Sequence, residues 1–129
     1  MHSRILRRWR IFFAAAGLLG LGGGIAGFLG GQPVPGHELP APLYPYLLDL
    51  LFAVVIIFGI GYLMVAADPL RHRGIVVLGV LSKVAGAAAT WWAVADGQIP
   101  SAAMVQPWIV DVPWAIGFAW FLWQTRPSG

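Results

Sequence analysis

Four long apolar segments, separated by short polar stretches, dominate the chain. They cover residues 11–31, 46–67, 74–95 and about 106–123. A helix rises about 1.5 Å per residue, so about 20 residues cross the hydrocarbon core of a bilayer, and each segment is long enough to span it. Only helices and closed barrels satisfy their backbone hydrogen bonds in lipid, and these lengths suit helices. We therefore expect an all-α, polytopic membrane protein: one domain over residues 1–129, folded as an antiparallel bundle of four transmembrane helices.

The composition supports the same class. Hydrophobic residues make up 59% of the 129 residues and charged residues only 10%, with a mean hydropathy of +0.77. A soluble domain of this size needs a more charged surface. The net charge of +3 would suit nucleic acid, but the basic residues lie in short clusters beside the apolar segments, which is typical of membrane orientation. We therefore expect membrane lipid as a partner and no nucleic acid.

The arginines are distributed asymmetrically between the two ends of the predicted helices. All seven lie before the first helix, between the second and third, or after the fourth, at positions 4, 7, 8, 10, 71, 73 and 126. The other two loops, residues 32–45 and 96–105, contain none. The positive-inside rule places the arginine-rich side in the cytoplasm. We expect a multi-pass protein of the bacterial plasma membrane with both termini cytoplasmic. We also expect an uncleaved first helix, because its apolar run is too long for a signal peptide.

The first apolar segment is rich in glycine, with eight in all. Gly20, Gly24 and Gly27 belong to overlapping small-xxx-small pairs, which let helix backbones approach closely in lipid. We expect these three, with Gly79 and Gly86 of the third helix, to pack helices together inside one compact bundle. The alternative is that the glycine face of the first helix packs a homo-oligomer or docks on a larger membrane complex.

The stretch between the second and third helices is short and polar, and reads ADPLRHRG. Pro69 ends the second helix, because proline cannot continue the hydrogen-bond ladder, and Asp68 before it is positioned to pair with Arg71 or Arg73. We expect a tight cytoplasmic hairpin, built from Asp68, Arg71, His72 and Arg73, that fixes the topology.

Lys83 lies inside an apolar stretch of the third helix, VLGVLSKVAGAAATWW. Its helical face holds Gly79, Gly86, Ala87 and Thr90, which are small or hydroxylated, while bulky apolar residues lie opposite. A lysine in the membrane costs at least ~2.5–3.5 kcal/mol on insertion scales, so such residues are usually paired or wetted and are candidates for function. A structural role, in which the lysine snorkels or pairs for packing alone, is the alternative.

Two intramembrane carboxylates, Asp49 and Asp111, are the candidate partners of Lys83. Each lies close to the outer end of its helix, so helix rise leaves about 10 Å between it and the lysine, farther than the side chains reach. A direct ion pair would need the helices to be offset, so we expect instead a water-filled ligand pocket that connects the three groups and opens toward the outer leaflet. Either carboxylate would serve equally well as a helix cap. The other residues of the predicted pocket are Trp91, Trp92, Trp114 and Thr90.

Catalytic and metal-binding patterns are sparse. The three histidines, at positions 2, 37 and 72, fall in three different aqueous regions, and the chain has no cysteine. We expect no metal and no catalytic cofactor, and we assign no catalytic residue. The ligand hypothesis is instead a bound lipid or quinone-like molecule. An acid–base isomerase that uses aspartate and lysine remains an open alternative.

The chain from residue 59 to about residue 121 resembles an uncharacterised family of small bacterial four-helix membrane proteins. The family pattern runs GxGYxxAAxDPxRHWxIVxxGxxGKxxGPxGFxWA and, further on, NDLxWWxPF; this chain has GIGYLMVAADPLRHRGIVVLGVLSKVAGAAATWWAVADG and VDVPWAIGF. Ser82, Ala87 and Val110 depart from the pattern. The four-helix layout is also similar to DoxX-like membrane bundles, which hold apolar ligands or serve as subunits of membrane redox systems. The positions that match the family pattern are Asp68, Pro69, Arg71, His72, Gly79, Lys83, Gly86, Trp92, Asp111 and Trp114.

These observations favour a membrane protein that holds an apolar or lipid-like ligand near Lys83. One alternative is a structural or accessory subunit of a larger membrane complex. Another is an intramembrane isomerase or a small transporter, and a chain of this length forms a transport path only as an oligomer.

Overall fold

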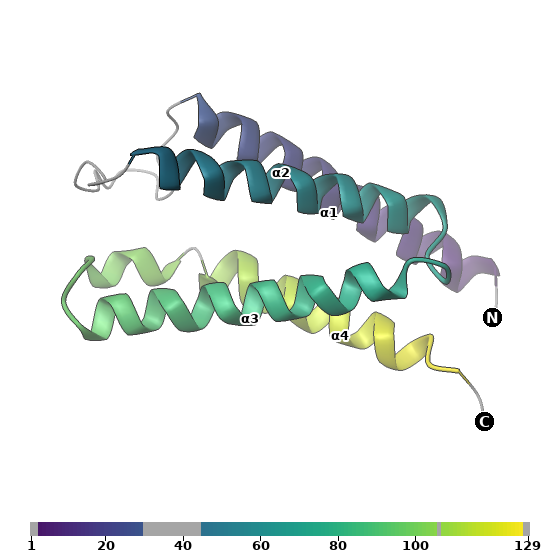
Figure 1. The fold of residues 1–129 in the computed structure, drawn as a ribbon. Coiled ribbons are helices and arrows are strands. Elements are labelled where there is room, and N and C mark those ends of the chain that lie inside the picture. Colours follow the sequence, from purple (N-terminus) through teal and green to yellow (C-terminus); the bar gives the residue numbers. More distant parts are fainter. Residues whose placement is uncertain (1–2, 30–44, 106, 128–129) are drawn as a thin grey trace.

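The computed structural model describes residues 3–29, 45–105 and 107–127, and within them every regular element is a helix (Figure 1). This confirms the all-α class. Three of the helices are long and apolar enough to cross a membrane, over Ser3–Phe28, Asp49–Ala67 and Arg73–Ala95, which indicates a membrane protein. The elements in order are α1 (Ser3–Phe28), α2 (Pro45–Ala67), α3 (Arg73–Ala95), the 3-10 helix η1 (Ser101–Met104), the π-helix η2 (Pro107–Asp111) and α4 (Val112–Gln124).

The first helix begins earlier than predicted. We expected it to start at residue 11, but α1 begins at Ser3 and runs through the arginine cluster. Arginine is a good helix former, and outside the apolar core its charge stays in water, so nothing ends the helix there. Most of the predicted outer loop, residues 32–44, lies outside the described residues.

The fourth predicted helix, residues 106–123, is instead made of successive pieces: η1, η2 and the short α4 of 13 residues. The reason is Pro113, which has no N–H to bond the carbonyl of Ile109 as an α-helix requires. A wider π turn over Pro107–Asp111 accommodates the lost bond. Helical structure in this segment begins at Ser101, five residues before the predicted start.

The helices associate in two pairs, α1 with α2 and α3 with α4, and the partners in each pair run in opposite directions (Figure 1). The α1–α2 contact is built on glycine. A Cβ atom added at Gly20 would lie 3.1 Å from the Cα of Gly59, and one at Gly24 would lie 2.6 Å from Cγ1 of Ile56. The glycine at position 27 lies against Phe52. The backbones approach this closely because no side chain separates them.

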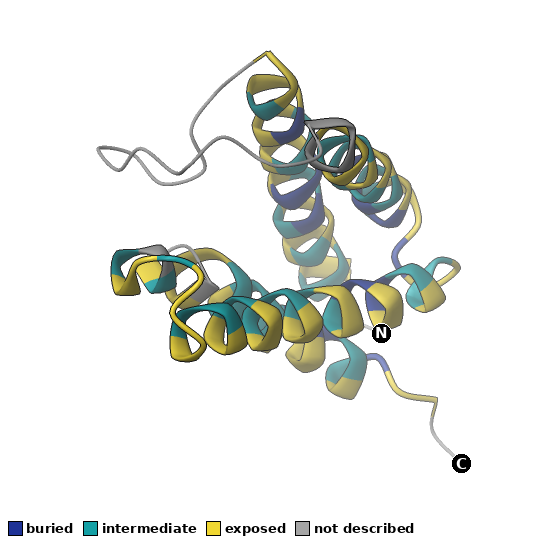
Figure 2. Ribbon diagram, turned by 60° about the vertical axis from the view of Figure 1, so that its left-hand side comes forward, coloured by how far each residue is buried: buried dark blue, intermediate teal, exposed yellow. Residues whose placement is uncertain are grey.

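An aromatic cluster joins the two pairs. Phe13 of α1 and Phe118 and Phe121 of α4 are fully buried, and Tyr62 of α2 is nearly so (dark blue in Figure 2). The ring centroids of Phe13 and Phe118 lie 5.2 Å apart, and those of Tyr62 and Phe118 lie 4.9 Å apart. The core therefore lies in the half of the molecule that contains the start of α1 and the end of α4.

Two arginines close the ends of neighbouring helices. Arg10 donates hydrogen bonds of 2.9 and 3.0 Å to the carbonyls of Ala66 and Ala67, at the end of α2. Arg73 donates bonds of 2.9 Å to the carbonyl of Leu122 and 3.0 Å to Oγ1 of Thr125, at the end of α4. A cation at a helix C-terminus satisfies otherwise unpaired carbonyls and complements the helix dipole.

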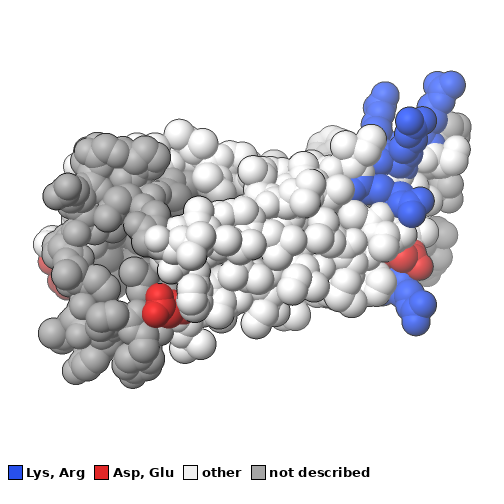
Figure 3. All heavy atoms as spheres, turned by 90° about the horizontal axis from the view of Figure 1, so that it is seen from above, with Lys and Arg blue, Asp and Glu red and all other residues white. Residues whose placement is uncertain are grey.

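The hairpin between α2 and α3 differs from the prediction in one contact. Within the described chain, Asp68 forms no ion pair with Arg71 or Arg73; the guanidinium of Arg73 turns to α4 instead. The Asp68 carbonyl lies 3.0 Å from Nδ1 of His72, which tightens the turn. Arginine side chains gather at this end of the molecule, where both chain termini lie (Figures 1 and 3).

Candidate functional site

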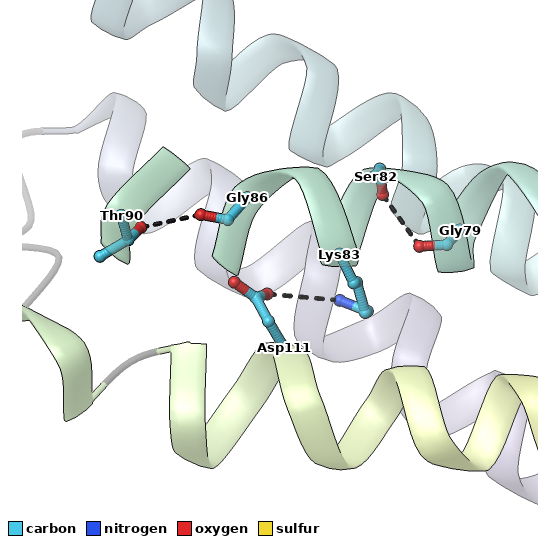
Figure 4. Close-up of polar contacts among 6 residues, drawn as sticks. All are labelled: Gly79, Ser82, Lys83, Gly86, Thr90 and Asp111. Atoms are coloured by element: carbon cyan, nitrogen blue, oxygen red, sulfur yellow. Dashed lines mark hydrogen bonds and ion pairs between the residues drawn. The ribbon is translucent and has the colours of Figure 1, made fainter. Parts of the chain in front are cut away.

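Lys83 and Asp111 form an ion pair between two apolar helical segments (Figure 4). Nζ of Lys83, in the middle of α3, lies 3.9 Å from Oδ1 of Asp111, the last residue of η2. Both side chains are largely buried, with 17% and 15% of their surfaces exposed. The expected vertical gap of about 10 Å between these two groups was therefore wrong, and they form a direct ion pair.

The error came from the predicted start of the fourth helix. With a helix beginning at residue 106, Asp111 would lie one turn below the outer surface, far above Lys83. Helical structure begins at Ser101, so Asp111 lies ten positions after the start of its segment, and Lys83 lies twelve positions before the end of α3. Because antiparallel neighbours rise by similar amounts per residue, the two charges reach nearly the same depth.

The carboxylate of Asp111 lies beside Gly86 of α3. A Cβ atom there would lie 3.5 Å from Oδ2 of Asp111, which is an ordinary van der Waals contact (Figure 4). The capping alternative for Asp111 is not observed. Its φ of −69° and ψ of −47° are helical, and its side chain makes no capping hydrogen bond to α4.

Asp49, the third charge of the predicted pocket, is not part of this contact. It lies in α2 one turn after Pro45 and is exposed. Among the residues that the structure describes, no ion pair joins it to Lys83. The site therefore contains one carboxylate.

Aromatic and hydroxyl groups surround the ion pair. The ammonium of Lys83 lies 5.8 Å from the centroid of the Phe118 ring, close enough for a cation–π interaction. Thr90, a predicted pocket residue, donates its hydroxyl to the carbonyl of Gly86 at 2.9 Å, within α3. Trp114, also predicted for the pocket, packs in the aromatic cluster, with its ring centroid 4.8 Å from that of Phe12.

An apolar hollow of about 600 Å³ lies between α3 and the segment formed by η1, η2 and α4. The two predicted tryptophans, Trp91 and Trp92, line it, and each leaves more than half of its surface exposed. Ala87, one turn after Lys83, and Val112, directly after Asp111, line its inner end, so the ion pair lies next to that end. The remaining lining residues are also uncharged: Ala88, Ala95, Met104 and Trp108.

Within residues 3–29, 45–105 and 107–127, no group of three or more His, Cys, Asp or Glu residues is placed to hold a metal ion. An apolar hollow that lies next to an ion pair suits a hydrophobic molecule that carries a polar group. Comparisons with protein families, with curated proteins and with solved structures find no match for this chain.

Sequence reasoning missed Phe118 as the ring beneath the lysine and Pro113 as the cause of the π turn. Both had a signal in the sequence. Trp114, Phe118 and Phe121 follow the i, i+4, i+7 spacing of one helix face, which predicts an inward aromatic stripe. Pro107 and Pro113 lie on either side of Asp111, and two prolines in a short segment predict an interrupted helix.

Proposed function

We propose that this chain is a four-span protein of the bacterial plasma membrane that binds one apolar, lipid-like molecule in the hollow beside Lys83 and Asp111. Both termini lie on the cytoplasmic side in this proposal, and the hollow opens toward the outer leaflet. The fourth span consists of η1, η2 and α4 together, since α4 alone is too short to cross.

The observation that carries the proposal is the loose geometry of the ion pair at the inner end of an apolar hollow. A separation of 3.9 Å between Nζ and Oδ1 is longer than the 2.7–2.9 Å typical of a charge-assisted hydrogen bond. In the part of the chain that the structure describes, the ammonium of Lys83 makes no hydrogen bond in addition to this ion pair. The ammonium donors that do not face Asp111 are therefore available to a carbonyl, hydroxyl or acidic group of a ligand.

The distribution of charge supports the membrane orientation. Arginine side chains occupy one end of the molecule, and the middle of the visible face carries no charged side chain (Figure 3). A positive end of this kind is typical of the cytoplasmic side of bacterial membrane proteins. The tryptophans of the hollow lie toward the opposite end, where amphipathic rings sit at the membrane–water interface.

Native mass spectrometry of the protein released gently from its own membrane tests the proposal. We expect a stoichiometric small-molecule adduct in the wild type. The adduct should be lost in the double variant Lys83→Met/Asp111→Leu, which removes both charges and so leaves neither one unpaired. Asp49→Asn, which removes a carboxylate outside the site, should retain it.

Two results would overturn the proposal. One is a wild-type protein that carries no adduct and is recovered only with other polypeptides, which would make it a subunit of a larger complex. The other is a double variant that is folded, by its circular dichroism, and that retains the adduct at the wild-type level.

A further inference from the structure

A second hollow, of about 390 Å³, lies at the arginine-rich end of the molecule, between the first turns of α1 and the last turns of α4. The four lining residues from α1 follow the i, i+3, i+4, i+7 spacing of a single helix face. The two from α4 are four positions apart and so also share a face. The lining residues are Ile5, Arg8, Trp9, Phe12, Trp120 and Gln124.

The back wall of this hollow is held in place. Nε1 of Trp9 donates a hydrogen bond of 2.7 Å to Oε1 of Gln124, which ties the two helices together. The ring of Trp9 lies edge-on to Phe12 and to Phe121, with both centroid distances 5.3 Å. The wall therefore does not depend on the free rotation of an exposed side chain.

The polarity of the hollow changes with depth. Arg10 donates hydrogen bonds to the last carbonyls of α2, so it marks the level at which that helix ends. Arg8 is exposed and lies two residues before Arg10 in α1, close to the same level. Gln124 ends α4 at the same level. Phe12 and Trp120 each lie one turn deeper, toward the middle of the membrane-crossing segments.

Hydrogen-bond donors are available at the shallow end. The oxygen of the Gln124 amide accepts from Trp9, and its nitrogen has no hydrogen-bond partner among the described residues. The guanidinium of Arg8 presents five further N–H donors and a positive charge. Cationic and amide donors above an aromatic groove match the two parts of a phospholipid, its phosphate and its acyl chain.

We propose that this hollow binds an anionic phospholipid of the cytoplasmic leaflet. Arg8 and Gln124 contact the headgroup phosphate, and one acyl chain lies along Phe12 and Trp120. Basic pockets between transmembrane helices on the cytoplasmic side suit anionic headgroups in this way. The proposal is independent of the ligand beside Lys83, because the two hollows share no lining residue.

Native mass spectrometry of the full chain in mild detergent, titrated with phosphatidylglycerol, tests this site. Arg8→Gln should weaken binding of the first phosphatidylglycerol about fivefold, the effect of one basic residue close to an anionic headgroup. Arg7→Gln is the matched control: it removes the same charge from the adjacent exposed position, which does not line the hollow, and should have a clearly smaller effect. Phosphatidylcholine with the same acyl chains carries a choline that offsets the phosphate charge, so it should bind more weakly and respond less to Arg8→Gln.

A second pair of variants tests the acyl part of the site. Trp120→Ala should weaken phosphatidylglycerol binding, whereas Trp123→Ala, which removes an equally exposed tryptophan outside the hollow, should not.

Equal losses of phosphatidylglycerol binding in Arg7→Gln and Arg8→Gln would show diffuse electrostatic attraction and overturn the site. Phosphatidylcholine binding as tightly as phosphatidylglycerol would overturn headgroup recognition. Full displacement of the lipid by millimolar inorganic phosphate would show a simple anion site and overturn the lipid assignment.

Discussion

The indole of Trp9 donates a hydrogen bond of 2.7 Å to the side-chain oxygen of Gln124 and so joins the start of α1 to the end of α4. Two arginines make related contacts at the same end, Arg10 from α1 to the end of α2 and Arg73 from α3 to the end of α4. Away from this end, α1 and α2 approach closely at glycines, and no ion pair joins the described residues of the two helices. Directional bonds therefore hold the arginine-rich end, and the rest of the α1–α2 interface depends on close packing.

Replacing Trp9 with phenylalanine keeps a ring against Phe12 and Phe121 and removes the hydrogen-bond donor. We expect a loss of about 1 kcal/mol in the free energy of unfolding, the usual worth of one such bond. Reversible unfolding in mixed micelles measures it. The double variant Trp9→Phe/Gln124→Leu should lose less than the sum of the two single variants, because the single changes remove the same bond. Strictly additive losses would show that the two side chains are not coupled.

Gly59 tests the glycine interface between α1 and α2. A Cβ atom at this position would lie 2.8 Å from the backbone nitrogen of Leu21 and 3.0 Å from the carbonyl oxygen of Gly17. Because backbone atoms cannot move aside as a flexible side chain can, Gly59→Ala should destabilise the fold by about 1–3 kcal/mol. The same unfolding assay measures this loss.

The matched control for this substitution is Gly22→Ala in α1, where a Cβ atom would meet nothing within 4 Å. It should leave the stability unchanged or raise it by up to about 1 kcal/mol, since alanine is the better helix former. A clear loss at Gly22 would mean that the open glycine face of α1 is packed against another molecule in the membrane.

The ion pair between Lys83 and Asp111 makes a prediction about stability that is separate from ligand binding. Lys83→Met or Asp111→Leu alone leaves the partner charge largely buried and unpaired, and each should lose up to about 3–5 kcal/mol. The double variant removes both charges and should recover to within about 1 kcal/mol of the wild type, because apolar residues replace a buried ion pair at little net cost. A double variant that is less stable than either single variant would contradict this account.

The sequence predicted the class of fold because that depends on properties summed over whole segments. Segment length and apolar content alone identify α1, α2 and α3, and the predicted ends of α2 and α3 lie within one residue of the observed ones. The prediction of one continuous helix for the fourth segment was wrong because a single residue changes the local hydrogen-bond pattern. Pro113 removes one donor, and hydropathy does not register that loss.

The candidate site was predicted only in part for a related reason. Lys83 is conspicuous in the sequence because a charge in an apolar helix is costly. Its partner depends on the relative depth of two helices. The predicted helix start at residue 106, in place of residue 101, shifts that depth by about 7.5 Å at 1.5 Å per residue. Sequence reasoning therefore treated Asp49 and Asp111 as equals, whereas only Asp111 is brought to the lysine.

Arg73 is expected to stabilise the end of α4. Arg73→Met removes its hydrogen bonds to the Leu122 carbonyl and to Thr125, and should lower the free energy of unfolding by about 1–2 kcal/mol. Arg71→Met is the control, since it removes the same charge from an exposed position in the same turn and should have no measurable effect on stability. Equal losses in the two variants would assign the effect to the net charge of the turn and not to the contact with α4.

The proposed topology can be read directly from cysteine labelling, because the chain has no cysteine of its own. Ser101→Cys places a thiol at the exposed start of η1, and Arg71→Cys and Pro127→Cys place thiols at the arginine-rich end; all three positions are exposed. In intact cells a small, charged maleimide that does not cross the plasma membrane should label the Ser101→Cys variant and leave the other two unlabelled. Disrupted cells provide the control, since all three variants should then react. Labelling of Pro127→Cys but not Arg71→Cys in intact cells would mean that the segment from η1 to α4 does not return across the membrane, and that the chain crosses it three times.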